Sequence, residues 1–521
     1  MEKQSTERRH SYAASSIELI DISKSFGPVE ANKNISMKVT KGTIHGIIGE
    51  NGAGKSTLMS ILYGFYKADK GKILINGESV NITDSNAAIA AGIGMVFQHF
   101  KLVENFTVLE NVVLGVEDGP FLSSSIQKAR VNLKALANEY ELNVDPDVTI
   151  DSLGVGIRQR VEILKALYRK AKILILDEPT GVLTPAEADH LFRILKNLKE
   201  EGKTIIFITH KLREIMEITD TVSVMRQGEM TATVRTKDTN PSELAELMVG
   251  RKVLLRVDKK PSNPGKKVLN IQSLNVVDHD GIQRLRNINL SVNAGEILGI
   301  AGVAGNGQSE LLEVLGGITE ANGSITVNGQ EIPLDGKHAN GQSRRQNNIA
   351  HVPEDRQHLG LIMEFKAWEN IALGYHNNKN YQYNNFLMDN ERIKQDAFSK
   401  MNQFDVRPNN TNLVTKGFSG GNQQKLVLSR EIERNPDLLL VGQPTRGVDI
   451  GAIEFIHQQL IRLRDSGKAI LLVSVELDEI LSLSDRIMVM FDGKIMGERD
   501  PLVTNEKELG LLMAGISEAN D

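Results

Sequence analysis

The feature that most constrains the fold is an internal repeat of domain length. The segment "GTIHGIIGENGAGKSTLMSILYG" in the first half matches "GEILGIAGVAGNGQSELLEVLGG" in the second, which places Gly49 and Gly302 at a spacing of 253 residues. Three more pairs follow in the same order at a spacing of 265: "DSLGVGIRQRVEILKAL" with "KGFSGGNQQKLVLSREI", "ILILDEPTGVLT" with "LLLVGQPTRGVD", and "FITHKLREI" with "LVSVELDEI". Four matched blocks in one order indicate a tandem duplication.

The repeat divides the chain into two domains. The stretch "RKVLLRVDKKPSNPGKKVL" lies between the halves, and its centre combines Lys, Pro, Asn, Ser and Gly, as linkers do. We therefore predict a first domain at 1–255, a linker at 256–266 and a second domain at 267–521. With 521 residues, 40% of them apolar, each half can bury its own core.

Short apolar runs alternate with helical segments in both halves. "IHGIIG" precedes "KSTLMSILYG", and "ILILDEP" lies between "QRVEILKALYRKA" and "AEADHLFRILKNLKEEG". Such alternation predicts an α/β fold with a mainly parallel sheet flanked by helices, formed twice.

Composition excludes several classes of function. The net charge of −5 gives no reason to expect binding to nucleic acid. The absence of cysteine excludes disulfides, thiolate metal sites and cysteine nucleophiles. The N-terminus lacks the apolar core of a secretory signal, and no apolar run reaches the roughly 18–20 residues of a spanning helix. We expect a soluble protein that works at a membrane only by docking on a partner that spans it.

The stretch "GENGAGKS" from Gly49 to Ser56 fits the phosphate-loop pattern G-x-x-x-x-G-K-[ST], between an expected strand and an expected helix. Backbone N–H groups of such a loop converge on phosphates, and the following helix adds its positive end. The alternative, a tight turn without ligand, leaves the Lys-Ser pair unexplained. The predicted phosphate-binding residues are Gly49, Asn51, Gly52, Gly54, Lys55, Ser56 and Thr57.

Two carboxylates end the expected strand "ILILD". Asp177 is predicted to hold Mg²⁺ together with Ser56, and Glu178 to orient or deprotonate the attacking water. Two surface acids at a strand end are the alternative, and the phosphate loop disfavours it. His210, after "TIIFIT", and Gln98, in "MVFQHF", are weak candidates by themselves, and Phe26 suits either a core or a base-stacking position.

Taken together, these motifs resemble the ATPase subunit of ABC transporters, over about residues 17–515. The most specific element is "FSGGNQQ", from Phe418 to Gln424, which is similar to that family's signature sequence. The resemblance implies two P-loop NTPase domains, each with a helical signature subdomain and a small antiparallel β part, and a need for ATP and Mg²⁺. It further implies that ATP binds between the phosphate loop of one half and the signature of the other. The roles it assigns are Gln98 as a metal and γ-phosphate ligand that also contacts a permease, His210 as the switch histidine, Phe26 as the adenine-stacking ring, and Ser419, Gly420, Gly421 and Asp449 as the contribution of the second half.

The two halves differ in a consistent way. Lys55, Asp177, Glu178 and His210 correspond to Gln308, Gly442, Gln443 and Val475, and the position of Gln98 corresponds to Glu354. The signatures differ in the opposite sense, because the first half has "LGVGIRQ", and its "GVLT" has Thr184 where the second half has Asp449. Crossing the halves gives one intact composite site, which we predict to hydrolyse ATP. The other site is predicted to bind nucleotide at most, and its residues are Gly302, Gly305, Gly307, Gln308, Ser309 and Gln443.

Within the family, a duplicated ATPase with no membrane span, a weak second site and the sequence "VPEDR" followed by "GL" resembles the subunits of simple-sugar and nucleoside importers. "MVFQHFKLVENFTVLENVVLG" favours the nucleoside branch, and a ribose- or galactose-like sugar is the alternative. The implied partners are two transmembrane permeases and, indirectly, a solute-binding lipoprotein or periplasmic protein, with the chain at the cytoplasmic face of the membrane. Two other classes are disfavoured: a soluble tandem ATPase acting on ribosomes or DNA, and a purely regulatory nucleotide-binding module.

Overall fold

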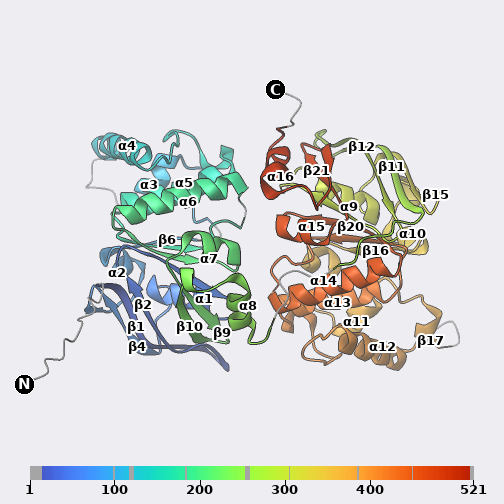
Figure 1. The fold of residues 1–521 in the computed structure, drawn as a ribbon, viewed down its shortest axis with the longest axis horizontal. Helices are drawn as coiled ribbons and strands as arrows, with labels where there is room; N and C mark the ends of the chain where they lie inside the picture. The colour runs from blue at the N-terminus through green and yellow to red at the C-terminus, as the bar shows by residue number, and fades with distance from the viewer. Residues whose placement is uncertain are drawn as a thin grey trace, which may run out of the picture. The chain divides into compact units, whose positions relative to one another are not determined.

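A computed structural model describes residues 14–97, 100–115, 122–181, 183, 185–252, 259–303, 305–383, 387–448 and 450–516. The chain divides into two compact units, residues 1–253 and 254–521, called unit 1 and unit 2 below (Figure 1). Each unit has its own sheets, helices and core.

Unit 1 contains two sheets and eight helices among its described residues. Its strands are β1 Ser15–Phe26, β2 Val29–Thr40, β3 Ile44–Gly49, β4 Lys70–Ile75, β5 Glu78–Val80, β6 Ile93–Val96, β7 Ile173–Asp177, β8 Thr204–Ile208, β9 Thr221–Arg226 and β10 Glu229–Arg235. Its helices are α1 Lys55–Leu62, α2 Ser85–Ala90, α3 Val108–Val113, α4 Leu122–Glu139, α5 Val155–Tyr168, α6 Pro185–Glu200, α7 Leu212–Ile218 and α8 Pro241–Val249.

The larger sheet of unit 1 has the strand order β10-β9-β3-β8-β7-β6, and only β10 runs antiparallel to its neighbour. Every residue of β3, β7 and β8 is buried, which explains why these strands are continuous apolar runs in the sequence. Because β3, β7 and β8 are parallel, their carboxyl ends meet at one edge of the sheet. The phosphate loop and the two carboxylates therefore lie at the same edge.

The smaller sheet of unit 1 is antiparallel, in the order β2-β1-β4-β5. Its inward side chains, among them Ile17, Ile22 and Ile35, share one core cluster with Ile47 of β3 and Leu58 of α1. The cluster joins β3 and α1 to the antiparallel sheet, so both ends of the phosphate loop are held by packed elements.

Unit 2 repeats this architecture. Its strands are β11 Lys267–Val277, β12 Gln283–Asn293, β13 Ile297–Ala301, β14 Asn322–Val327, β15 Gln330–Glu331, β16 Ile349–Val352, β17 Gln382–Tyr383, β18 Leu387–Met388, β19 Leu438–Gly442, β20 Ala469–Ser474, β21 Arg486–Phe491 and β22 Lys494–Arg499. Its helices are α9 Gln308–Gly316, α10 Gly341–Gln346, α11 Ala367–Ala372, α12 Asn390–Gln403, α13 Gly420–Ile432, α14 Ile450–Asp465, α15 Leu477–Leu483 and α16 Glu506–Met513, with a π-helical turn at Arg356–Gly360.

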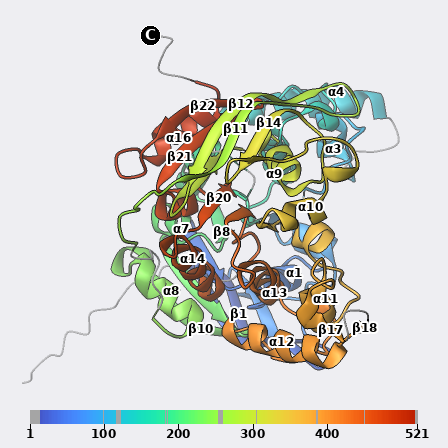
Figure 2. The ribbon, with the colours of Figure 1, turned by 90° about the vertical axis from the view of Figure 1, so that its right-hand side faces the viewer.

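The strand orders of unit 2 are β16-β19-β20-β13-β21-β22 and β12-β11-β14-β15, the same as in unit 1 element by element. Figure 2 shows β11, β12 and β14 side by side in the antiparallel sheet. Unit 2 adds the short hairpin β17–β18. The predicted fold, two α/β units that each carry a small antiparallel sheet, is confirmed.

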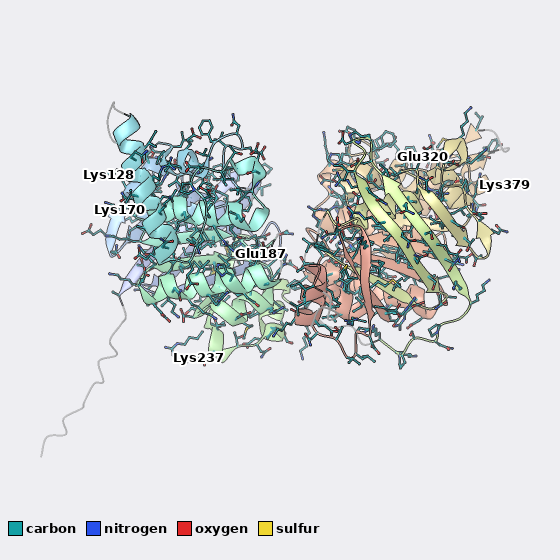
Figure 3. The ribbon with its side chains drawn as sticks, turned by 90° about the horizontal axis from the view of Figure 1, so that it is seen from above. Lys128, Lys170, Glu187, Lys237, Glu320 and Lys379 are labelled. Carbon is teal, nitrogen blue, oxygen red and sulfur yellow. The ribbon has the colours of Figure 1, made fainter. Side chains whose placement is uncertain are left out.

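Charged side chains lie on the outside of each unit, including Lys128, Lys170 and Lys237 of unit 1 and Glu320 and Lys379 of unit 2 (Figure 3). Among the described residues, no helix combines the length and the apolar composition needed to cross a membrane.

Two residues within the predicted linker, Lys259 and Lys260, are bonded to unit 2. Arg464, which is 1% exposed, donates from Nη2 to the Lys260 carbonyl at 2.9 Å and from Nη1 to Asp485 at 2.8 Å. Lys259 donates to the Ser484 carbonyl. Residues 259–260 are thus part of the packing of unit 2.

Candidate active site

The phosphate loop of unit 1 connects β3 to α1 and is open on one side. Gly54 has φ +98°, and a Cβ there would lie 2.3 Å from the Ala31 carbonyl oxygen, so only glycine fits. Gly52 has φ +83°, and nothing lies within 4 Å of where its Cβ would project. Asn51 and Ser56 are exposed, and no side chain caps the first turn of α1. The N–H groups of that turn therefore keep their capacity to bind an anion.

Lys55 crosses the loop from the inside. Its side chain is buried at 6% exposure, and Nζ donates to the carbonyls of Gly49 at 2.7 Å and Glu50 at 3.1 Å. Burial lowers the pKa of Lys55, and the charges of Glu178 and Asp177 partly offset that shift. The ammonium group is thus held at the loop by carbonyl oxygens, and an arriving phosphate would compensate its burial.

Asp177 ends β7 and is only 8% exposed. Burial and the neighbouring Glu178 raise the pKa of Asp177, while a hydrogen bond from Ser56 opposes them. A hydroxyl and a buried carboxylate in contact form a donor set that suits Mg²⁺. The chemistry of these groups therefore fits the predicted cation.

Glu178 has the left-handed backbone conformation, with φ +46°. Its Oε1 lies 3.0 Å from Nδ1 of His210. Burial raises the pKa of Glu178, but the hydrogen bond and charge of His210, with Lys55 and Lys211, outweigh burial and leave the pKa below its ordinary value. Glu178 is therefore ionised at neutral pH, as a general base must be.

Phe26 lies at the end of β1 with 42% of its surface exposed. The ring of Tyr66 meets it edge-on at 5.1 Å between centroids, and Nζ of Lys24 lies 5.6 Å from the Phe26 centroid. The exposed ring suits stacking on a base. Thr57 follows Ser56 in α1 and is half-buried, whereas Gln98 lies outside the described residues.

The second loop, between β13 and α9, keeps the backbone of the first. Gly307 has φ +105°, and the Cβ position of Gly305 faces open space. Gln308 is 4% exposed; its Nε2 donates to the Val303 carbonyl at 3.1 Å, and its Oε1 accepts the Asn306 N–H at 3.2 Å. A Cβ on Gly302 would lie 1.9 Å from that Nε2, so the carboxamide fills the inside of the loop.

The carboxylate of the second site comes from a different strand. Ser309 donates to Glu354, which follows β16, with 2.6 Å between Oγ and Oε2. A Cβ on Gly442 would lie 2.5 Å from Cγ of Glu354, so glycine at 442 makes room for Glu354. Gln443 keeps the conformation of Glu178, with φ +46°, and its Oε1 accepts the Val475 N–H at 3.3 Å.

The two signature helices begin alike. Ser419 precedes α13 with φ −62° and ψ 158°, and Gly154 precedes α5 with φ −63° and ψ 158°. The Ser419 side chain does not cap α13, and Gly154 has no side chain that could cap α5. Ser419 is exposed and accepts a hydrogen bond from Asn422 at 2.8 Å, Gly420 is half-buried and Gly421 is buried. Asp449 and Thr184, the other predicted difference between these regions, lie outside the described residues.

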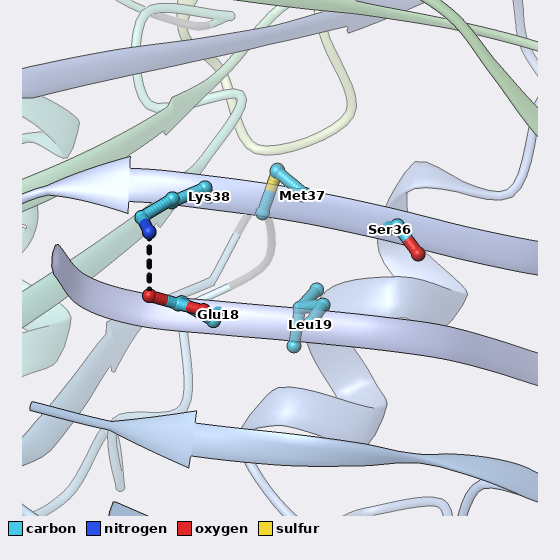
Figure 4. Close-up of a pocket in the computed structure, with 5 residues that line it drawn as sticks. All are labelled: Glu18, Leu19, Ser36, Met37 and Lys38. Carbon is cyan, nitrogen blue, oxygen red and sulfur yellow. Dashed lines mark ion pairs between the residues drawn. The ribbon is translucent and has the colours of Figure 1, made fainter. Parts of the chain in front are cut away.

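Figure 4 shows a surface pocket on the antiparallel sheet of unit 1, lined by Glu18, Leu19, Ser36, Met37 and Lys38. Lys38 pairs with Glu18 at 2.9 Å. None of the predicted site residues lines this pocket.

Sequence reasoning noted Gly442 and Glu354 as separate differences between the halves and missed their contact. It also missed Tyr66 and Lys24 beside Phe26. A signal that could have identified the first pair is that both positions change between the two halves, at the ends of adjacent strands β16 and β19.

Comparison with known proteins identifies the family. The profile of the ABC transporter family matches residues 32–181 and 285–446, more than half of the chain. The chain is 48% identical over 500 residues to the guanosine import ATP-binding protein NupO of Bacillus subtilis, covering 96% of this chain and 97% of NupO. It is 46% identical to the nucleoside import ATP-binding protein NupA of Lactococcus lactis, covering 96% and 98%. It is 42% identical to the glucose import ATP-binding protein TsgD13 of Haloferax volcanii, covering 96% of each chain.

Proposed function

This chain belongs to the ABC transporter family and is an ATPase, and on that premise we propose that it powers an importer for nucleosides. The observation that carries the solute class is the similarity, across nearly the whole chain, to relatives named for guanosine and nucleoside import. The glucose import relative keeps a simple sugar, of the ribose or galactose type, as the second candidate.

We propose one hydrolytic site and one degenerate site. In the hydrolytic site Lys55 and the loop N–H groups bind the phosphates, Glu178 orients and deprotonates the attacking water, and His210 holds the Glu178 carboxylate. Bound Mg²⁺ would supply positive charge to the phosphates, held by Ser56, Asp177 and Gln98. Ser419, Gly420, Gly421 and Asp449 complete this site, as expected for the family.

The proposed assembly contains two transmembrane permeases and a separate solute-binding lipoprotein or periplasmic protein. The chain works at the cytoplasmic face of the cell membrane, with residues 1–255 and 267–521 as its two ATPase domains and 256–266 as the linker. The permeases dock beside Gln98 and beside the Glu354 segment. Binding of ATP favours one state of the pair of domains, and hydrolysis releases it, so the permease is switched between its two states.

Reconstitution with the permeases tests this function. We expect the complex in vesicles to take up labelled guanosine with ATP hydrolysis, and labelled ribose or glucose not to be taken up. Uptake of sugar alone would assign the chain to a sugar importer. ATP hydrolysis that permeases and solute leave unchanged would contradict the role in transport. Neighbouring genes for two permeases and a lipoprotein would independently support it.

A further inference from the structure

One short segment of unit 2, Glu354–Gln357, contacts four separate parts of that unit. Glu354 accepts the Ser309 hydroxyl of the phosphate loop and packs against Gly442 at the end of β19. Arg356 donates from Nη1 to the Arg446 carbonyl at 2.8 Å. Gln357 donates to Gln423 of α13 at 3.2 Å.

Arg356 also lies directly against the signature. A Cβ on Gly420 would be 2.7 Å from Nη2 of Arg356 and 3.0 Å from the Gly447 carbonyl oxygen. The Gly420 backbone therefore occupies a slot between the guanidinium and that carbonyl. At the first turn of α13, Gly420 therefore lies between the Arg356 guanidinium and the Gly447 carbonyl.

This arrangement is unfavourable as a means of stabilising the helix. A cation at the N-terminus of a helix opposes the helix dipole. Burial lowers the pKa of Arg356, and its buried Nε has no hydrogen-bond partner among the described residues. A neutral side chain would pack here at lower cost, so the contact points to a role beyond stability.

The matching positions of unit 1 change together. Counted from the preceding strand, Phe100 corresponds to Arg356, and Val155 corresponds to Gly420. A side chain at 420 would force the Arg356 guanidinium out of its present position, because a Cβ there would lie 2.7 Å from Nη2. Arginine and glycine thus occur together in the unit whose signature keeps Ser-Gly-Gly.

We propose that Arg356 is a positioning residue for ATP turnover. Arg356 holds Ser419–Gly421 at a fixed distance from residues 446–447. The signature and this neighbouring segment then form one rigid surface. The proposal rests on the proposed function, because it requires that the signature of unit 2 completes the ATP site of unit 1.

The test uses the permease-reconstituted complex with the full-length chain. Arg356→Ala should lower kcat by roughly tenfold to a hundredfold, the size expected when a positioned group shifts by about 1 Å. The Kd for a fluorescent ATP analogue and the melting temperature should stay unchanged. Arg356→Lys should recover part of kcat, because lysine can still donate to the Arg446 carbonyl but cannot reach the wall of the Gly420 slot at the same time.

Arg344 is a matched control. It also lies in unit 2 and carries a buried nitrogen without a partner among the described residues, but its two hydrogen bonds go to the carbonyls of Leu315 and Val314 in α9 and not to α13. Arg344→Ala should lower the melting temperature and leave kcat unchanged, the reverse of Arg356→Ala. If Arg356→Ala lowers the melting temperature as Arg344→Ala does, and the two variants change kcat to the same extent, the positioning role is wrong.

Ser419→Ala separates this proposal from the function on which it rests. Loss of kcat in Ser419→Ala with normal kcat in Arg356→Ala overturns the positioning role alone. Normal kcat in both, with kcat lost in Lys55→Ala, overturns the composite site. Loss of kcat in both, with partial recovery in Arg356→Lys, supports the proposal.

Discussion

Lys55 and Gln308 occupy the same position in two loops of the same shape, and both cross their loop from the inside. The lysine donates to the Gly49 and Glu50 carbonyls, and the glutamine donates to the Val303 carbonyl, which corresponds to that of Glu50. The glutamine also occupies one loop N–H, that of Asn306. Both units therefore keep the side-chain contact that shapes the loop, whereas unit 2 lacks the positive charge that would bind phosphate.

The carboxylates show the same separation of shape from chemistry. In unit 1 the serine after the loop lysine bonds to Asp177 on β7, and in unit 2 it bonds to Glu354 after β16. Glu178 and Gln443 share one backbone conformation, yet the first meets an imidazole and the second a backbone N–H. Unit 2 has replaced each lost group with a contact inside the protein.

The largest effect is expected from exchanging Glu178 and Gln443, the residues that follow β7 and β19. Glu178→Gln should lower ATP turnover by about 10²–10⁴-fold, because a general base contributes that much, while ATP still binds. Gln443→Glu should not raise turnover, since unit 2 has Gln308 and Val475 where unit 1 has Lys55 and His210. Turnover is measured by phosphate release from the reconstituted complex. Substantial hydrolysis in Glu178→Gln would show that the second site works.

The loop residues test the comparison next. Lys55→Ala should lower turnover by roughly 10²–10³-fold, since it removes a charged donor to the phosphates, and should weaken binding of ATP. Gln308→Ala should change turnover by less than about threefold, because the carboxamide is neutral and bonds only within its own loop. Steady-state kinetics on the two variants side by side checks this, and equal losses would contradict the assignment of the two sites.

The smallest effect is expected at Gly442, where a substitution tests whether this position is coupled to Glu354. Gly442→Asp should lower the free energy of unfolding by about 1–3 kcal/mol, because the new side chain would collide with Glu354 and Leu312. The double variant Gly442→Asp, Glu354→Gly should recover part of that loss. Denaturant unfolding of the full chain measures both. A neutral Gly442→Asp variant would show that the two positions are not coupled.

The sequence predicted those parts of the molecule that depend on local pattern and repetition. The duplicated α/β fold, the buried parallel strands and the placement of Lys55, Asp177 and Glu178 at one sheet edge all followed from apolar runs and motif spacing. Spacing alone could not predict that Glu354 fills the space left at Gly442, that Gln308 occupies the Asn306 N–H, or that Arg356 lies against Gly420. These contacts join segments distant in the chain, and they depend on how the strands and the loops after them pack.

The conformation of Gln443 has one further consequence. A left-handed backbone costs a side-chain-bearing residue roughly 1–2 kcal/mol, and in unit 1 that strain aims a base. In unit 2 the same strain is retained at a residue with no carboxylate to aim. The backbone conformation after β7 and β19 is therefore a property of the duplicated fold. The side chain at 443 could change during evolution while this backbone conformation stayed the same.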